Sequence, residues 1–320
     1  MKEETLRVAL AQLTPQWLDR EGTLEIIKDA MQTSASRGAD LLVFGEAFLP
    51  GYPFWLASLD GAAWELKENK ALHAHYLKNS ITPEEGDLEG VVQLASQLGI
   101  SVYLGLVERA KNRGGHSLYC SLAYIDPRLG LASIHRKLQP TYDERLTWSP
   151  GDGNGLRVHK KGPFHLGGLN CWENWMPLVR ASLYAQGTNV HVAVWPGSDH
   201  NTRDITRFIA RESRSYVLSV SSLMRPEAFP ESTPYRELLL QRCPEVLANG
   251  GSCIASPDGS WLMEPRVGEE GIFMEDLSLQ PIYEARQNFD PSGHYSRPDV
   301  TRLVLDRSRQ SVLEFEDPDI

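Results

Sequence analysis

Three side chains that could act together chemically stand at the ends of apolar runs: a carboxylate, an ammonium and a thiol. Glu46 ends the run ADLLVFGE, Lys137 ends GLASIHRK, and Cys171 ends HLGGLNC. Catalytic groups in α/β folds often gather at the carboxyl ends of strands, where loops border a crevice. The carboxylate is suited to act as a general base, the ammonium to stabilise developing negative charge, and the thiol to attack an electrophilic carbon. The set therefore predicts nucleophilic catalysis through a covalent intermediate.

Cys171 lies between a strand-like run, FHLGGLN, and a helix-like run, WENWMPLVRASLYAQG. We expect a thiol at such a turn to be exposed at the end of a sheet. The free N–H groups of the helix N-terminus should lower its pKa. A single free cysteine is more often a small buried apolar residue, and Glu46 or Lys137 alone is typical of a solvated surface. The argument rests on the three residues together.

Other catalytic arrangements have weaker support. The histidines nearest to Cys171, His159 and His165, lie in a poorly defined strand region, and no papain-like signature surrounds the cysteine. The chain lacks the G-x-S-x-G elbow of serine hydrolases and the glycine-rich patterns that bind nucleotides. Its four cysteines form no CxxC pair, so we expect neither a metal site nor a disulfide framework.

The composition narrows the class of partner. The chain has 320 residues and a formal net charge of -10, which argues against nucleic acid because phosphate binding needs clustered Lys and Arg. The sequence has no signal-like N-terminus and no apolar stretch near the ~20 residues that span a bilayer. We expect a soluble cytoplasmic protein with no membrane partner.

Strand-like and helix-like runs alternate, which favours one mixed-sheet α/β domain over residues 5–279. A hairpin is expected across residues 126–130, a helix over 175–187, and a strand–turn–strand unit over 250–277 with Asp258-Gly259 at the turn. Residues 280–320 lack clear periodicity. We expect them to form an extended tail over the surface or over a partner subunit.

The chain resembles the nitrilase superfamily of carbon–nitrogen hydrolases, and within it the nitrilase branch, from Leu6 to about Leu277. The segments GEAFLPGYP, HRKLQPTYDERLTWSPGDG and GGLNCWENWMPL are similar to those that hold the family's catalytic glutamate, lysine and cysteine. The resemblance implies these roles for Glu46, Lys137 and Cys171. It also implies a four-layer αββα sandwich that dimerises to αββααββα, with larger spirals common in the branch.

The resemblance also extends to features of the nitrilase branch of the superfamily and to a second glutamate. Cys171-Trp172-Glu173 is typical of nitrilases, as is the tail motif DPSGHYSRPD, whereas aliphatic amidases and carbamoylases usually differ after the cysteine. Asn174 stands where many microbial nitrilases have His, which leaves the substrate preference open. Glu144 matches the family's second glutamate and is expected to position substrate and to hydrogen-bond Lys137. The alternative for Glu144 is a salt bridge with Arg145 at the rim.

The resemblance implies hydrolysis of an organic nitrile to the carboxylic acid and ammonia through a thioimidate and a thioester, without metal or cofactor. The backbone N–H of Trp172 is expected to help Lys137 hold negative charge. Two alternatives remain: an amidase or N-carbamoyl amide hydrolase with the same three residues, and a non-catalytic binding member of the fold. We expect a homo-oligomer built from dimers.

The substrate pocket is expected to be apolar, to suit an apolar or aryl nitrile. Its candidate walls adjoin the catalytic segments, and each aromatic among them could equally be a core residue. They are Tyr52, Tyr142, Trp172, Trp195 and Pro196. His294 in the tail could reach the site, but a structural hydrogen-bonding role is more typical of such a residue.

Overall fold

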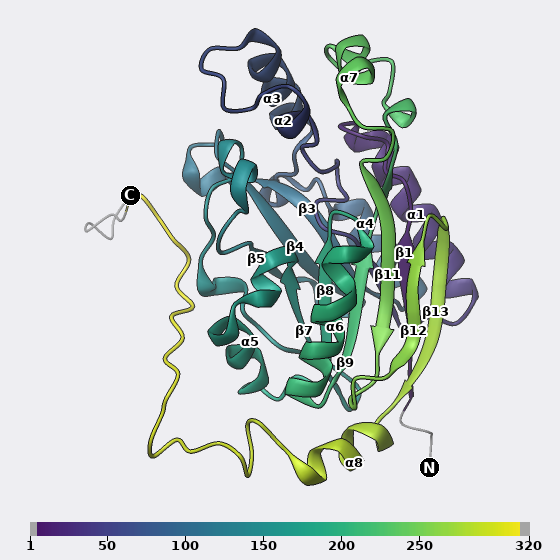
Figure 1. Ribbon diagram of the computed structural model, residues 1–320, viewed down its shortest axis with the longest axis vertical. Helices are drawn as coiled ribbons and strands as arrows, with labels where there is room; N and C mark the ends of the chain where they lie inside the picture. The colour runs from purple at the N-terminus through teal and green to yellow at the C-terminus, as the bar shows by residue number, and fades with distance from the viewer. Residues whose placement is uncertain (1–4, 314–320) are drawn as a thin grey trace.

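The computed structural model describes residues 5–313 as two β-sheets packed face to face (Figure 1). The first sheet has the order β13 (Gly271–Ser278), β1 (Thr5–Gln12), β2 (Leu41–Phe44), β3 (Ser101–Arg109), β4 (Leu118–Asp126), β5 (Gly130–Arg136). The second has the order β10 (Leu223–Met224), β11 (Ala248–Ala255), β9 (Tyr216–Ser221), β8 (Val190–Trp195), β7 (Phe164–Asn170), β6 (His159–Lys161), with β12 (Trp261–Val267) beside β11.

Helices cover the outer face of each sheet, which gives the predicted αββα layers. On the first sheet, α1 (Arg20–Ser36) and α4 (Glu89–Leu98) bury Ile27 and Val91 in one apolar cluster with strand residues such as Leu42. On the second sheet, α6 (Asp199–Ser213) and α5 (Pro177–Tyr184) do the same. Strands such as β2, all four of whose residues are buried, are apolar throughout because both of their faces are covered.

The main core lies between the two sheets. Val43 and Leu122 of the first sheet belong to one buried cluster with Leu166, Val192 and Leu218 of the second. The facing strands approach closely at Gly168 on β7, where an added Cβ would lie 2.8 Å from the Leu122 side chain. This packing fixes how the ends of β5 and β7 face each other.

The predicted hairpin across residues 126–130 is confirmed as β4 and β5. The prediction of one strand–turn–strand unit over 250–277 is wrong, because this run forms three strands. Gly268, with φ +71°, turns the chain after β12. The chain then crosses to the first sheet, where β13 pairs antiparallel with β1. The helix expected over 175–187 is shorter, since α5 ends at Tyr184 and the preceding turn is a 3-10 helix.

The remaining helices lie at the two ends of the sheets. In Figure 1, α2 (Trp55–Ser58), α3 (Lys67–Asn79) and α7 (Arg236–Arg242) project at one end, and α8 (Gln280–Asn288) lies at the other. The 3-10 helices are η1 (Pro83–Glu85), η2 (Lys111–Arg113), η3 (Tyr142–Leu146), η4 (Gly153–Gly155), η5 (Cys171–Trp175) and η6 (Pro226–Ala228). Within residues 5–313, no helix has the length and apolar character needed to cross a bilayer.

The segment after Gln280 is more ordered than its sequence pattern indicated. It begins with α8, whose Ile282 is buried in the core between the sheets. An irregular stretch then leads back along the molecule (Figure 1). It packs so closely on Gly153 that an added Cβ there would lie 2.1 Å from the Asp306 carbonyl oxygen. Arg309 pairs with Asp152 at 3.0 Å. Residues 314–320 of the expected tail lie outside the described residues.

Candidate active site

Glu46 lies on a tight loop directly after β2. Its backbone N–H donates to the Trp195 carbonyl oxygen at 3.0 Å, which ties this loop of the first sheet to the second. The loop passes over Gly105 of β3, where an added Cβ would lie 2.0 Å from the Gly45 carbonyl oxygen. A side chain at position 105 would therefore displace the backbone that carries Glu46. The Glu46 side chain is fully buried.

Lys137 follows β5 and points into the same interior. Its backbone is held on both sides, by a bond from its N–H to the Cys120 carbonyl and by one from the Gly151 N–H to its own carbonyl. Its Nζ lies 2.8 Å from Glu46 Oε1 and 2.7 Å from Glu144 Oε2. Arg145 instead donates to the Pro140 carbonyl. The structure thus places Glu144 on Lys137 and not in a rim salt bridge.

Cys171 begins η5 with a φ of +46°, a backbone region that non-glycine residues rarely adopt. Cys171 Sγ and one carboxylate oxygen from each of Glu46 and Glu144 all lie within 4.8 Å of one another. The expectation that the thiol is exposed is wrong, because only 3% of the residue is accessible. It is enclosed in a cluster with Tyr184 and Trp195. The three predicted catalytic side chains and Glu144 therefore meet in one buried site.

The expected net lowering of the thiol pKa is also wrong, although the Trp172 N–H at the helix start acts in the expected direction. Burial raises the pKa of Cys171 well above its usual range, and Glu46 adds to this effect. Lys137 and the Trp172 backbone N–H oppose the rise without reversing it. The resting nucleophile is a protonated thiol, so it needs a base nearby.

Glu46 has the properties of that base. Burial, opposed by Lys137 and reinforced by Glu144, raises the pKa of Glu46 to about 7. Burial alone would lower the pKa of Lys137, but the neighbouring Cys171, Glu46 and Glu144 raise it well above its usual range. A base that is half ionised near neutral pH thus lies beside an ammonium group that is charged in the resting site.

Glu46, Glu144 and Cys171 also have the ligand types and spacing that could hold a metal ion. The Lys137 ammonium group is already bound by both carboxylates. The positive charge that these acceptors attract is therefore supplied by the chain itself.

Glu173 holds the cysteine turn against the lysine segment. Its carboxylate accepts the Asn170 N–H at 2.9 Å, in front of the cysteine, and the Leu138 N–H at 2.6 Å, directly after Lys137. His135 Nε2 lies 3.1 Å from both of its oxygens. Although burial opposes the change, His135 and the two N–H groups lower the pKa of Glu173. An ionised carboxylate thus links the two catalytic segments.

Asn174 supports the same turn from behind. Its Nδ2 donates to the Cys171 carbonyl at 2.8 Å, so its Oδ1 accepts from His191 Nε2 at 2.7 Å. Burial and then Arg180 lower the pKa of His191 to about 3, which keeps the imidazole neutral. The Asn170–Glu173 spacing matches a capping box and could have revealed part of this arrangement. The bonds to Leu138 and His191 leave no local pattern in the sequence.

Two of the five candidate pocket residues, Tyr52 and Pro196, line a cavity beside Glu46, and the other three do not. Tyr52 donates to Glu144 Oε1 at 2.9 Å and lines a small cavity with Glu46 and Pro196. Trp195 is fully buried among core residues and bonds Ser219. Tyr142 and Trp172 are 86% and 52% exposed in the single chain. The cavity is also lined by residues that sequence reasoning missed, which are Pro15, Ala47, Phe48, Phe54, Ser222, Leu223 and Met224.

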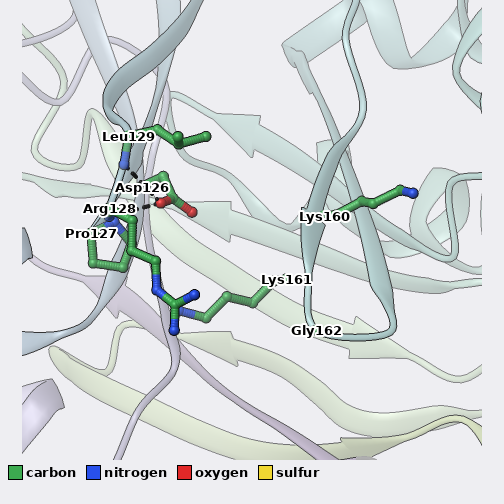
Figure 2. Close-up of a pocket in the computed structure, with 7 residues that line it drawn as sticks. All are labelled: Asp126, Pro127, Arg128, Leu129, Lys160, Lys161 and Gly162. Atoms are coloured by element: carbon green, nitrogen blue, oxygen red, sulfur yellow. Dashed lines mark hydrogen bonds between the residues drawn. The ribbon is translucent and has the colours of Figure 1, made fainter.

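Two further features lie away from this site. His294 is exposed in the irregular stretch after α8, where its ring meets that of Tyr295. A separate cavity lies between the β4–β5 turn, residues 126–129, and the β6–β7 turn, residues 160–162 (Figure 2). Since β5 and β7 begin near these turns and end at Lys137 and Cys171, this cavity is at the opposite end of the strands.

Comparison with known proteins agrees with this architecture. The model of the carbon-nitrogen hydrolase family matches residues 7–287. Among curated relatives, "Nitrilase 2" of an unknown prokaryotic organism is 35% identical over 98% of this chain and 96% of its own. "Aliphatic nitrilase" of Sinorhizobium fredii is 34% identical over 96% and 97%, and "Arylacetonitrilase" of Macrophomina phaseolina is 32% identical over 96% and 92%.

Solved structures show the same fold. An amidase from Nesterenkonia sp. has a TM-score of 0.65 and 19% identity, covering 90% of this chain and 95% of its own. A mutant of the Nesterenkonia AN1 amidase, described as being from the nitrilase superfamily, has a TM-score of 0.64 and 18% identity, covering 90% and 96%. At this identity the similarity concerns the fold alone. Because the family model matches residues 7–287 and relatives above 30% identity match over nearly their full length, the chain belongs to the carbon-nitrogen hydrolase family of the nitrilase superfamily.

Proposed function

We propose that this enzyme hydrolyses an organic nitrile to the carboxylic acid and ammonia. The observation that carries the proposal is the buried contact of Lys137 with both Glu46 and Glu144, beside the Cys171 thiol. Full-length relatives named as nitrilases support the substrate class. The apolar side chains that lie near Glu46, such as Phe54 and Met224, are of the kind that suits an apolar nitrile.

The first half of the reaction forms a thioimidate. Glu46 takes the proton of the Cys171 thiol while the sulfur adds to the nitrile carbon. The nitrile nitrogen gains negative charge and receives a proton from Lys137, which then recovers one from Glu46, its neighbour at 2.8 Å. One S–C bond has formed, one C–N π bond has broken, and the thiol proton has moved to nitrogen. The Trp172 N–H helps to hold the developing charge.

The second half releases the products. Glu46 deprotonates a water that adds to the thioimidate carbon, and Lys137 protonates the nitrogen to an amine and recovers a proton from Glu46. Glu46 then takes the proton of the new hydroxyl while Lys137 protonates the amine, so that the C–N bond breaks, ammonia leaves and a thioester remains. A second water, activated in the same way, adds to the thioester and expels the Cys171 thiolate as a thiol. The balance is one nitrile and two waters to one acid and one ammonia. Glu144 and Tyr52 position Lys137 and the substrate in both halves.

Ammonia release from aliphatic, aryl and arylaceto nitriles, each beside its matching amide, tests the proposal. We expect turnover of at least one nitrile and one covalent adduct on Cys171 by intact and peptide mass spectrometry. Cys171→Ala and Cys171→Ser should abolish both. Turnover of amides with none of nitriles would support the amidase alternative. A folded protein with no turnover and no adduct on either panel would favour the non-catalytic alternative.

We further propose that the working form is a homo-oligomer built from dimers, with the segment from Gln280 contributing to association. Aromatic and apolar side chains of η5 and the start of α5 support this, since Trp172, Trp175 and Leu178 are exposed in the single chain. Light scattering of the full chain and of a chain ending before Asp290 tests it. We expect weaker association and lower activity in the shorter chain.

A further inference from the structure

A second thiol touches the base of the candidate active site. Cys120 lies in β4, is 1% exposed, and places its Sγ 3.4 Å from Glu46 Oε1. The same Oε1 lies 2.8 Å from the Lys137 ammonium. Since a thiol is a donor and an ionised carboxylate only accepts, Cys120 donates to Glu46. One oxygen of the carboxylate is thus held by two donors.

The other carboxylate oxygen of Glu46, Oε2, is free to take part in the reaction. Among residues 5–313, Glu46 Oε2 is buried and has no hydrogen-bond partner. A buried carboxylate oxygen without a partner is unusual, because such an oxygen loses its hydration without compensation. It is therefore the oxygen suited to accept a proton from the nucleophile or from water.

We propose that Cys120 is a positioning residue that holds Glu46 Oε1 and thereby presents Oε2 as the basic oxygen of the site. This inference rests on the proposed function of Glu46. The thiol does not touch the reacting atoms and acts through the carboxylate. Its position in β4 is rigid, because the Cys120 carbonyl accepts the Lys137 N–H at 2.7 Å. One residue of β4 therefore contacts both the lysine backbone and the glutamate side chain.

The effect of Cys120 should be visible in the ionisation of Glu46. The groups that influence or contact this carboxylate come from several elements and are Lys137, Glu144, Cys171, Tyr52, Tyr76 and Cys120. Of these, Lys137 and Cys120 stabilise the ionised form through hydrogen bonds. Removing the Cys120 donor should raise the pKa of Glu46. A hydroxyl in its place should preserve or strengthen the bond.

The experiment measures two pH profiles in wild type, Cys120→Ala and Cys120→Ser. One is kcat/KM on the best substrate. The other is the rate at which iodoacetamide alkylates Cys171, with the site of alkylation located by peptide mass spectrometry. Alkylation depends on the base that deprotonates the thiol, but it does not require turnover. In Cys120→Ala we expect the midpoint of the acidic limb of both profiles to shift to higher pH by about half to one unit. This is the change in pKa that the loss of one hydrogen bond to the ionised carboxylate implies. At pH values below the limb, rates should fall about three- to tenfold.

Cys120→Ser and a matched control separate this effect from general damage. The serine variant should keep the limb at or below its wild-type position. Cys253→Ala removes an equally buried thiol of β11, in the second sheet, which donates to Thr206 and not to a catalytic group. It should lose stability without moving either limb.

Unchanged limbs in Cys120→Ala, or equal upward shifts in the alanine and serine variants, would overturn the inference. The proposed function fails separately, if wild type turns over no nitrile or if Glu46→Gln retains turnover. The alkylation profile still reports on Cys120 in the first of those cases.

Discussion

His135 Nε2 lies 3.1 Å from each carboxylate oxygen of Glu173, across the interface between the two sheets. His135 belongs to β5, two residues before Lys137, and Glu173 belongs to η5, two residues after Cys171. Since Glu173 also accepts the Leu138 and Asn170 N–H groups, the pair sets the separation between the ammonium and the thiol. Precision in that separation matters because catalysis depends on alignment of the reacting groups.

Glu173→Gln should lower both stability and activity. The amide keeps the shape but turns one acceptor into a donor that faces an N–H or the imidazole, which costs about 1–3 kcal/mol. Urea unfolding and kcat measure the two effects. Glu245→Gln is the matched control, because its carboxylate is 82% exposed in a pair with Arg225 and should contribute little. Wild-type stability in Glu173→Gln would show that the link is dispensable.

The pH dependence of wild-type kcat/KM should show an acidic limb with a midpoint near 7. The pKa of Glu46 is raised to about 7, first by burial. The base is active when ionised, so the rate falls as pH falls through that value, by about tenfold per unit below it. Initial rates across about pH 5 to 9 on one substrate give the midpoint, since this range brackets that pKa. A limb near the ordinary glutamate value would contradict the raised pKa of Glu46.

Gly105→Ala should damage the site without touching substrate. The new Cβ would lie 2.0 Å from the Gly45 carbonyl oxygen, so the loop carrying Glu46 must move. We expect a loss of about 1–3 kcal/mol in stability and a larger loss in kcat than in substrate binding. Gly90→Ala in α4 is the control, since its nearest neighbour is a lysine carbon at 3.9 Å. Equal behaviour of the two variants would contradict the close approach.

Arg309→Ala should loosen the loop behind Lys137. Arg309 pairs with Asp152 at 3.0 Å and donates to the Ile134 carbonyl, and the neighbouring Gly151 bonds the Lys137 carbonyl. Loss of the charged donor should cost about 1–3 kcal/mol in stability and lower kcat. Arg302→Ala, at an exposed residue of the same segment, should have no effect in thermal unfolding or ammonia assays. If both variants resemble wild type, the segment does not brace the loop.

The catalytic residues at the ends of the apolar runs were the part of the site that could be predicted from the sequence. Glu46 and Cys171 follow strands that are largely buried, whereas Lys137 follows β5, a half-buried strand at the edge of its sheet. Their meeting could be predicted from the ends of these runs and from the resemblance. The layers could also be predicted, since strands covered on both faces lack polar alternation.

Contacts between distant segments could not be read in this way. Cys120 looks like any small apolar residue of a buried strand, and only the packing of the Glu46 loop over β3 and β4 turns its thiol toward the carboxylate. The burial of Cys171 depends on the packing of Tyr184 from α5 and Trp195 from β8 around it. The helix α8 was missed because its stability comes from the docking of Ile282 and from the Arg286 bond to the Thr188 carbonyl and not from its own weak pattern.

The division of the site between the two sheets makes activity a measure of tertiary docking. Glu46 and Lys137 follow strands of the first sheet, and Cys171 follows a strand of the second. A folding intermediate in which both sheets had formed but had not packed together would therefore contain every catalytic residue and have no activity. During refolding, far-ultraviolet circular dichroism would follow strand formation, while the return of turnover would time the moment when the sheets close on each other.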